Sequence, residues 1–351
     1  MKLFTVGPTQ MFPYTLEVAS KQLPYFRTED FSRVNLECVE KMKELLHAGG
    51  GAEVILLTAS GSAAMEAVVS NAFDEKDKLL IINGGTFGER FCQIAEIYHI
   101  PHDEVKLELG ETLTREHFDR FDLDSYTALL VNLDETSTGQ LYDIEMLSEI
   151  CREHNIKFVS DEISSFLADP FDMEKYGVDA VIISSQKALA ISPGLSIIAL
   201  SKRFYEENIK NREKRNLYLD INEHILNMKR GQTPNTPAVG IILELQDRLR
   251  HIESYEAEVE RTAKLAKYFR EKAVEAGLEL PQYPLSNAVT PVIIPNHKAK
   301  EVFNYLKEKY DIYVNPTGGK TADDVVRVAH IGNLVEADYD ELIEKMKEVL
   351  S

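Results

Sequence analysis

The chain has 351 residues, with 39 lysines and arginines against 58 aspartates and glutamates, so its net charge is −19. This surplus argues against a nucleic acid or an anionic membrane surface as the main partner, because both are themselves negatively charged. Hydrophobic residues make up 44% of the chain and charged residues 28%. These proportions are ordinary for a globular protein and exclude a disordered scaffold.

The three cysteines, Cys38, Cys92 and Cys151, are odd in number and far apart. This usage predicts free thiols in a reducing compartment rather than a disulfide framework. The first residues lack the apolar core of a signal peptide, and no apolar run reaches the roughly 20 residues that a membrane helix needs. We therefore expect a cytoplasmic protein with no membrane segment and no nucleic-acid partner.

Short apolar runs alternate with amphipathic, helix-like segments in the first two thirds of the chain. The runs are apolar throughout, as expected for strands that are buried on both faces. The alternation predicts a mainly parallel α/β sheet covered by helices. The runs lie at residues 53–60, 77–83, 126–135, 156–164, 179–188 and 194–201.

The pattern changes after residue 236. Residues 237–277 predict one or two long helices, and a strand follows at 287–295. A helix at 299–310, two strands near 312–314 and 325–331, and a closing helix at 336–350 complete the chain. We expect these elements to form a second, smaller α+β unit.

Two charged residues stand at the ends of apolar runs. Lys187 follows the run AVIISSQ, and Asp161 follows IKFVS. A partly buried lysine loses its charge easily and can form a Schiff base, and a buried carboxylate needs a cationic partner. Pyridoxal phosphate satisfies both residues, since Asp161 can pair with its protonated ring nitrogen while Lys187 carries its aldehyde. Each residue alone also fits an ordinary strand end or a lysine that extends to solvent.

Two glycine-containing loops add a phosphate site and an aromatic ring. The segment TASGSAAMEA places Ser60, Gly61 and Ser62 between a strand and a helix, where backbone N–H groups suit a phosphate. The segment NGGTFGERF presents Phe87, which could lie flat on a planar cofactor. A plain helix cap and a turn with one core phenylalanine are the alternatives. The nine histidines form no HExxH and no spacing typical of metal ligands, so no metal is expected.

Several segments together resemble the class V aminotransferases of pyridoxal-phosphate fold type I. The likeness is greatest to the alanine–glyoxylate, serine–pyruvate and 2-aminoethylphosphonate–pyruvate aminotransferases. The segments that carry it are VGPT (6–9), SGSAAMEA (60–67), NGGTFGER (83–90), DETSTG (134–139), SDEISSF (160–166), SSQKAL (184–189) with PG (193–194), TPNTP (233–237) and VRVAHIG (326–332).

The resemblance implies a fold as well as a cofactor. It implies a large domain with a mainly parallel seven-stranded sheet and a smaller C-terminal α+β domain. We place an N-terminal arm at residues 1–15, the large pyridoxal-phosphate domain at 16–240, and a connector helix with the small domain at 241–351.

The resemblance also implies a role for each matching cofactor residue. Lys187 would form the Schiff base and move the proton, and Asp161 would pair with the ring nitrogen. The other cofactor residues would lie around the ring and the phosphate. Phe87 and Ile163 would cover the two ring faces, Thr136 would lie near the ring hydroxyl, and Ser60, Gly61, Ser62 and Gln186 would hold the phosphate.

Two further roles extend beyond the cofactor pocket of one chain. Thr233 would reach the phosphate of the neighbouring subunit, which implies a homodimer with shared sites. Arg327 would bind the substrate carboxylate as a bidentate pair.

The implied activity is transfer of an amino group from a small donor to pyruvate or glyoxylate as the 2-oxo acid acceptor. Alanine, serine and 2-aminoethylphosphonate all remain open as the donor, because Ser62 and Phe87 depart from the residues that relatives favour. The alternatives are a lyase of the same fold, similar to a desulfurase or a kynureninase, and a non-catalytic binding module. A desulfurase needs a cysteine in the second half of the chain, but none occurs after Cys151.

Overall fold

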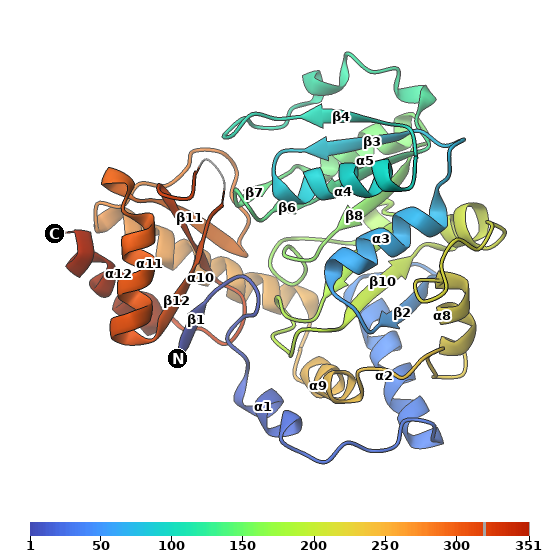
Figure 1. Cartoon of the computed structure of the whole chain (residues 1–351), viewed down its shortest axis with the longest axis horizontal. Helices are drawn as coiled ribbons and strands as arrows, with labels where there is room; N and C mark the ends of the chain where they lie inside the picture. The colour runs from blue at the N-terminus through green and yellow to red at the C-terminus, as the bar shows by residue number, and fades with distance from the viewer. Residues whose placement is uncertain (319–320, 351) are drawn as a thin grey trace.

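The computed structural model describes residues 1–318 and 321–350. Its elements form a large sheet with helices on both faces and a smaller sheet with its own helices (Figure 1). The large sheet lies between residues 53 and 200, and the small one is built mainly from residues after 288. The chain is thus an α/β protein of the fold class predicted from the sequence.

The large sheet has seven strands in the order β2-β10-β9-β8-β5-β3-β4. Strand β10 runs antiparallel to both of its neighbours, and all other pairs are parallel. The strands are Glu53–Leu57 (β2), Leu79–Asn83 (β3), His102–Lys106 (β4), Ala128–Asn132 (β5), Lys157–Asp161 (β8), Ala180–Ser184 (β9) and Ser196–Leu200 (β10).

Alternate residues of these strands enter two separate hydrophobic cores, one on each face of the sheet. The first core packs against helices Glu29–Leu45 (α2), Ile144–Glu153 (α5) and Val239–Arg250 (α9). The second packs against Gly61–Ala72 (α3), Thr86–Ile97 (α4) and Ile221–Met228 (α8). Burial on both faces explains why the central strands are apolar throughout.

The small sheet has the order β1-β12-β13-β11 and a third core of its own. Its strands are Lys2–Phe4 (β1), Val289–Ile293 (β11), Ile312–Pro316 (β12) and Val325–Ala329 (β13). Its helices are Tyr255–Glu275 (α10), Ala299–Tyr310 (α11) and Glu336–Leu350 (α12). Because β1 pairs in parallel with β12, the first residues of the chain join the same sheet as its last strands (Figure 1). The division at residues 15 and 240 stays a prediction.

Shorter elements connect these layers. They are helices Pro13–Ala19 (α1), Met173–Tyr176 (α6) and Lys202–Phe204 (α7), a two-stranded ribbon of Asp134–Glu135 (β6) and Gln140–Leu141 (β7), 3₁₀ turns at Arg115–Phe118, Leu123–Ser125 and Pro295–His297, and a π-helical turn at Tyr205–Ile209. None of the helices within the described ranges is long and apolar enough to cross a bilayer.

Candidate active site

The polar ends of the central strands meet at one cavity of the large sheet. Strands β5 and β8 end at Asn132 and Asp161, and β9 is followed closely by Lys187. Parallel strands present their carboxyl ends at the same edge, where ligands of open α/β sheets bind. The cavity is lined by Ser60, Gly61, Ser62, Phe87, Arg90, Asn132, Asp134, Thr136, Asp161, Ile163, Ser164, Gln186 and Lys187. Every predicted site residue except Thr233 and Arg327 therefore lines it.

The N-terminal segment holds the backbone next to Lys187. The backbone N–H of Thr9 donates to the carbonyl of Gln186 at 3.1 Å, and the Thr9 hydroxyl donates to the carbonyl of Lys187 at 2.9 Å. A Cβ on Gly7 would lie only 3.0 Å from Cδ of Lys187, so the absence of a side chain lets the two segments pack closely. The VGPT segment, for which no role was predicted, thus supports the lysine.

The amine of Lys187 lies in a poorly solvated position with opposing charges around it. Burial lowers its pKa to about 8 and Arg327 adds to that effect, while the carboxylates of Asp134 and Asp161 oppose it. No side chain within the described part of the chain accepts a hydrogen bond from Nζ. A substantial fraction of this amine is therefore neutral near pH 8 and available to react.

Asp161 is a buried carboxylate that has hydrogen bonds but no ion pair among the described residues, although the charge of Lys187 acts on it. Oδ1 accepts from the backbone N–H of Ile163 at 2.8 Å, and Oδ2 accepts from the side-chain amide of Asn132. Burial outweighs these bonds and raises its pKa from 3.8 to about 6. That shift disfavours the ionised form by on the order of 3 kcal/mol, which a cation placed against the carboxylate would offset.

The N-terminus of α3 forms part of the cavity wall. Ser60 is the N-cap residue, and its side chain makes no capping hydrogen bond, so its hydroxyl is available to a ligand. The first N–H groups of a helix lack intrahelical acceptors, and together with the helix dipole they attract anions. Arg90 donates to the Ser62 hydroxyl at 2.8 Å and adds a positive charge to this wall. A Cβ on Gly61 would lie 2.4 Å from Cδ1 of Ile163, so glycine lets that side chain reach the cavity.

Glu135 fixes the loop that carries Phe87. Its carboxylate accepts from the backbone N–H groups of Phe87 at 3.1 Å and of Gly88 at 3.0 Å. The Arg90 guanidinium lies 5.0 Å from the centre of the Phe87 ring. The position of Phe87 at the cavity wall is therefore fixed by hydrogen bonds to its backbone and by the guanidinium against the face of its ring.

Four residues of the cavity were not predicted from the sequence, namely Arg90, Asn132, Asp134 and Ser164, and Asp134 is the hardest of them to explain without a ligand. It is 2% exposed, and neither carboxylate oxygen has a hydrogen-bond partner among the described residues. Burial and the nearby Asp169 raise its pKa to about 8. It belongs to the DETSTG segment, where the neighbouring Thr136 shares a 2.6 Å hydrogen bond with Ser164. In the sequence, only its position after a buried strand indicates that Asp134 could be a site residue.

Arg327 approaches the cavity from β13 of the small sheet. It donates to the carbonyl of Thr136 at 2.7 Å and to that of Pro316 at 3.0 Å, and its buried Nε has no partner in the described ranges. It lines a larger neighbouring cavity of about 940 Å³, and Phe87 lines both cavities. The arginine thus lies beside the first cavity rather than in its wall.

Thr233 does not line the cavity of its own chain. Its hydroxyl donates to the carbonyl of Asn235 at 2.7 Å, and its own carbonyl accepts from Arg27 at 2.8 Å.

Comparison with known proteins places this geometry in a family. The family described as aminotransferase class V matches residues 18–337. This chain belongs to the class V aminotransferases. An uncharacterised aminotransferase of Methanocaldococcus jannaschii is 30% identical over 343 residues, which cover 94% of this chain and 87% of the relative. A 2-aminoethylphosphonate–pyruvate transaminase of Phocaeicola vulgatus is 28% identical, with 84% and 83% of the two chains covered. The solved alanine–glyoxylate aminotransferase of Nostoc sp. superposes with a TM-score of 0.92 at 27% identity, over 99% of this chain and 95% of that one.

The cofactor of this class V aminotransferase is pyridoxal phosphate, and the residues of the cavity fit it. The phosphate matches the N-terminus of α3 with Arg90 beside it, and a protonated ring nitrogen matches Asp161, which has no cation of its own. The aldehyde matches the amine of Lys187, which makes no hydrogen bond within the described ranges. The orphaned oxygens of Asn132 and Asp134 show that the cavity keeps polar groups for a ligand.

Proposed function

We propose that this class V aminotransferase moves an amino group from a small donor to pyruvate or glyoxylate. Alanine, serine and 2-aminoethylphosphonate are the candidate donors, and the first and the third occur in the names of the Nostoc sp. and Phocaeicola vulgatus enzymes. The observation that carries the proposal is the Lys187 amine, whose pKa is lowered to about 8 and which lies in one cavity with Asp161 and the anion-binding end of α3. Such a lysine is suited both to attack a carbonyl and to move a proton.

Pyridoxal phosphate, when bound, supplies an aldehyde that exchanges amino groups and a ring that withdraws electrons. Lys187 would move the proton between Cα of the amino donor and C4′ of the cofactor, because its Nζ can be charged or neutral near pH 8. Asp161 would keep the ring nitrogen protonated through its buried negative charge. Ser60, Gly61, Ser62 and Gln186 would hold the phosphate, Phe87 and Ile163 would cover the two ring faces, and Thr136 would lie near the ring hydroxyl.

We assign the substrate carboxylate to Arg327. Its Nε is buried without a partner in the described ranges, so the guanidinium has a donor to spare. Among the described residues, its two terminal nitrogens bond only to the backbone carbonyls of Thr136 and Pro316, which a carboxylate can outcompete because charged hydrogen bonds are stronger. Pyruvate and glyoxylate both present a carboxylate next to the reacting carbonyl.

The lyase alternative is not favoured. The three cysteines are buried, none is in a disulfide, and none lines the cavity with Lys187. Burial raises the pKa of the Cys38 and Cys92 thiols to about 12, so neither is a ready nucleophile. A non-catalytic binding module would not need a lysine with a lowered pKa beside two carboxylates.

We further propose a cytoplasmic homodimer with shared sites. Thr233 does not line the cavity of its own chain, yet Arg27 ties its backbone to the segment in which Leu23 and Tyr25 are exposed. Exposed apolar side chains such as Leu23 and Tyr25, close to Thr233, are typical of a subunit interface. The unpaired cysteines support a reducing compartment.

The proposal is tested by mixing the purified chain, with pyridoxal phosphate, with each donor and each acceptor in pairs. Chromatography of the amino-acid products should show alanine formed from pyruvate, or glycine from glyoxylate, with at least one donor. Lys187→Ala provides the blank. Absence of any product above that blank, across all pairs, would contradict the proposed function.

A further inference from the structure

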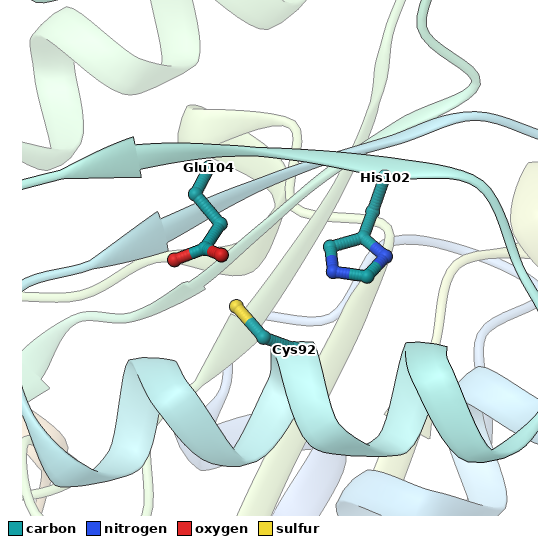
Figure 2. A group of neighbouring side chains, drawn as sticks. All are labelled: Cys92, His102 and Glu104. Atoms are coloured by element: carbon teal, nitrogen blue, oxygen red, sulfur yellow. The ribbon is translucent and has the colours of Figure 1, made fainter.

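Cys92, His102 and Glu104 form a cluster of potential metal ligands outside the cavity of Lys187. Their ligand atoms all lie within 4.8 Å of one another. His102 and Glu104 are two residues apart on the edge strand β4, so both point to the same face, and Cys92 faces them from α4 (Figure 2). Cys92 is buried, while His102 and Glu104 are partly exposed, which leaves a path for an ion from solvent.

The surroundings of this cluster are negatively charged. Glu89, Glu96 and Glu104 all act on the Cys92 thiol, and together with burial they raise its pKa to about 12. Neither Glu89 nor Glu104 forms an ion pair with a lysine or arginine in residues 1–318 and 321–350, which leaves their charges without a cation. A divalent cation would neutralise charges that the described side chains leave unbalanced.

Neighbouring groups orient the ligands as they do around known metal sites. Nδ1 of His102 lies 3.2 Å from the carbonyl of Ile100, and when it donates there the other ring nitrogen carries the free lone pair. The side-chain amide of Asn83 donates to Oε2 of Glu104 at 2.7 Å, and Oε1 has no hydrogen-bond partner among the described residues. Carbonyl and amide partners of this kind fix the tautomer and direction of metal ligands.

We propose that Cys92, His102 and Glu104 bind a divalent transition-metal ion, with zinc as the best match. One thiolate, one imidazole and one carboxylate are the ligands that zinc takes, and a water molecule completes a tetrahedral site with three protein ligands. On binding, the S–H bond of Cys92 breaks, a metal–sulfur bond forms, and the proton leaves to solvent. The ion would join the edge strand β4 to α4, the helix that begins at Thr86 beside Phe87. None of the three ligands lines the Lys187 cavity, so this inference is independent of the proposed function.

The test uses the chain with its pyridoxal phosphate, treated with a chelator and then titrated with Co²⁺ and Zn²⁺. We expect one ion per chain, a cobalt–thiolate charge-transfer band, and loss of that band when Zn²⁺ displaces Co²⁺. Because binding releases the thiol proton, affinity should rise with pH. Cys92→Ser should abolish the band, and His102→Gln and Glu104→Gln should each weaken zinc binding at least about tenfold.

Cys151→Ser is the matched control, because Cys151 is equally buried but has no place in the cluster. It should keep the band and the affinity. The proposal is overturned if Co²⁺ gives no thiolate band, if the band survives Cys92→Ser, or if both His102→Gln and Glu104→Gln bind zinc as the unchanged chain does. The two partly exposed residues provide this test even if Cys92→Ser does not fold.

Discussion

The charges of Lys187 and Asp134 act on each other, and the pKa values of the two groups are shifted toward each other. Burial lowers the pKa of the lysine and raises that of the aspartate, and both arrive at about 8. Each charge supports the other, so removal of the carboxylate makes the lysine easier to deprotonate. Lys187 and Asp161 could be predicted because charged residues that follow apolar runs are conspicuous. Asp134 also follows an apolar run, but it stands at the start of a polar turn where an aspartate is ordinary, so that position alone did not single it out.

The first prediction concerns the pH dependence of cofactor attachment. Only the neutral amine attacks an aldehyde, so the rate at which the cofactor-free chain couples pyridoxal phosphate should rise as pH increases through about 8 and then level off. Asp134→Asn should shift this midpoint to lower pH. Mass spectrometry of borohydride-reduced samples measures the rate, and Asp30→Asn, at an exposed carboxylate, is the control. A midpoint near 10.5, the ordinary lysine value, would contradict the account.

The second prediction concerns Arg327. Arg327→Lys keeps the charge but loses the fork that binds a carboxylate with two hydrogen bonds. We expect the KM for pyruvate or glyoxylate to rise roughly ten- to hundredfold, the loss typical of a charge-assisted hydrogen bond. Steady-state kinetics measure it, with Arg33→Ala as an exposed control. An unchanged KM would remove Arg327 from substrate binding.

At the scale of elements, the site depends on where strands end and helices begin. The six buried strands could be predicted from their apolar runs, but the seventh, β4, could not. Its sequence HDEVK is polar because an edge strand pairs on one side only and lies partly in solvent. The pairing of β1 with β12 could not be predicted either, because the three residues of β1 are too few to show an alternation of apolar and polar side chains. The cluster of Cys92, His102 and Glu104 could not be predicted from the sequence either, because Cys92 and His102 belong to different elements.

The third prediction tests the packing of α3 against the loop after β8. Gly61→Ala places a Cβ 2.4 Å from Cδ1 of Ile163 and should weaken pyridoxal phosphate binding roughly ten- to hundredfold. Adding Ile163→Val removes that very atom and should restore most of the affinity. Fluorescence titration with the cofactor measures both variants. Gly50→Ala is the control, since its Cβ would meet nothing within 4 Å. If the double variant binds as weakly as Gly61→Ala, the clash is not the cause.

At the scale of the whole molecule, the N-terminal segment and a strand of the small sheet both lie next to the cavity that the large sheet forms. Thr9 supports Lys187, and Arg327 reaches across from β13 to the carbonyl of Thr136. These segments could be predicted to contribute to the site because they resemble segments of the family. Their convergence is a long-range property that no local pattern contains, and the contribution of a second subunit remains a proposal.

The fourth prediction tests shared sites in the proposed homodimer. Lys187→Ala chains and Thr233→Asp chains should each be nearly inactive, the second because a carboxylate would repel the phosphate. If Thr233 serves the neighbouring cavity, a mixed dimer has one intact site, and mixing should restore about a quarter of the unchanged activity. The mixture is measured after exchange of subunits, with each variant alone as control. If Thr233 acts only in its own chain, mixing restores nothing.

The most direct test of the central claim is a single half of the reaction, followed by absorbance. The chain with bound pyridoxal phosphate is mixed with one donor at a time and no acceptor. We expect at least one donor to convert the cofactor to its pyridoxamine form and to yield one equivalent of 2-oxo product per site, and Lys187→Ala to slow this by about 10²–10⁴-fold. A spectrum that no donor changes, or a variant that converts the cofactor at the unchanged rate, would contradict an aminotransferase that acts through Lys187.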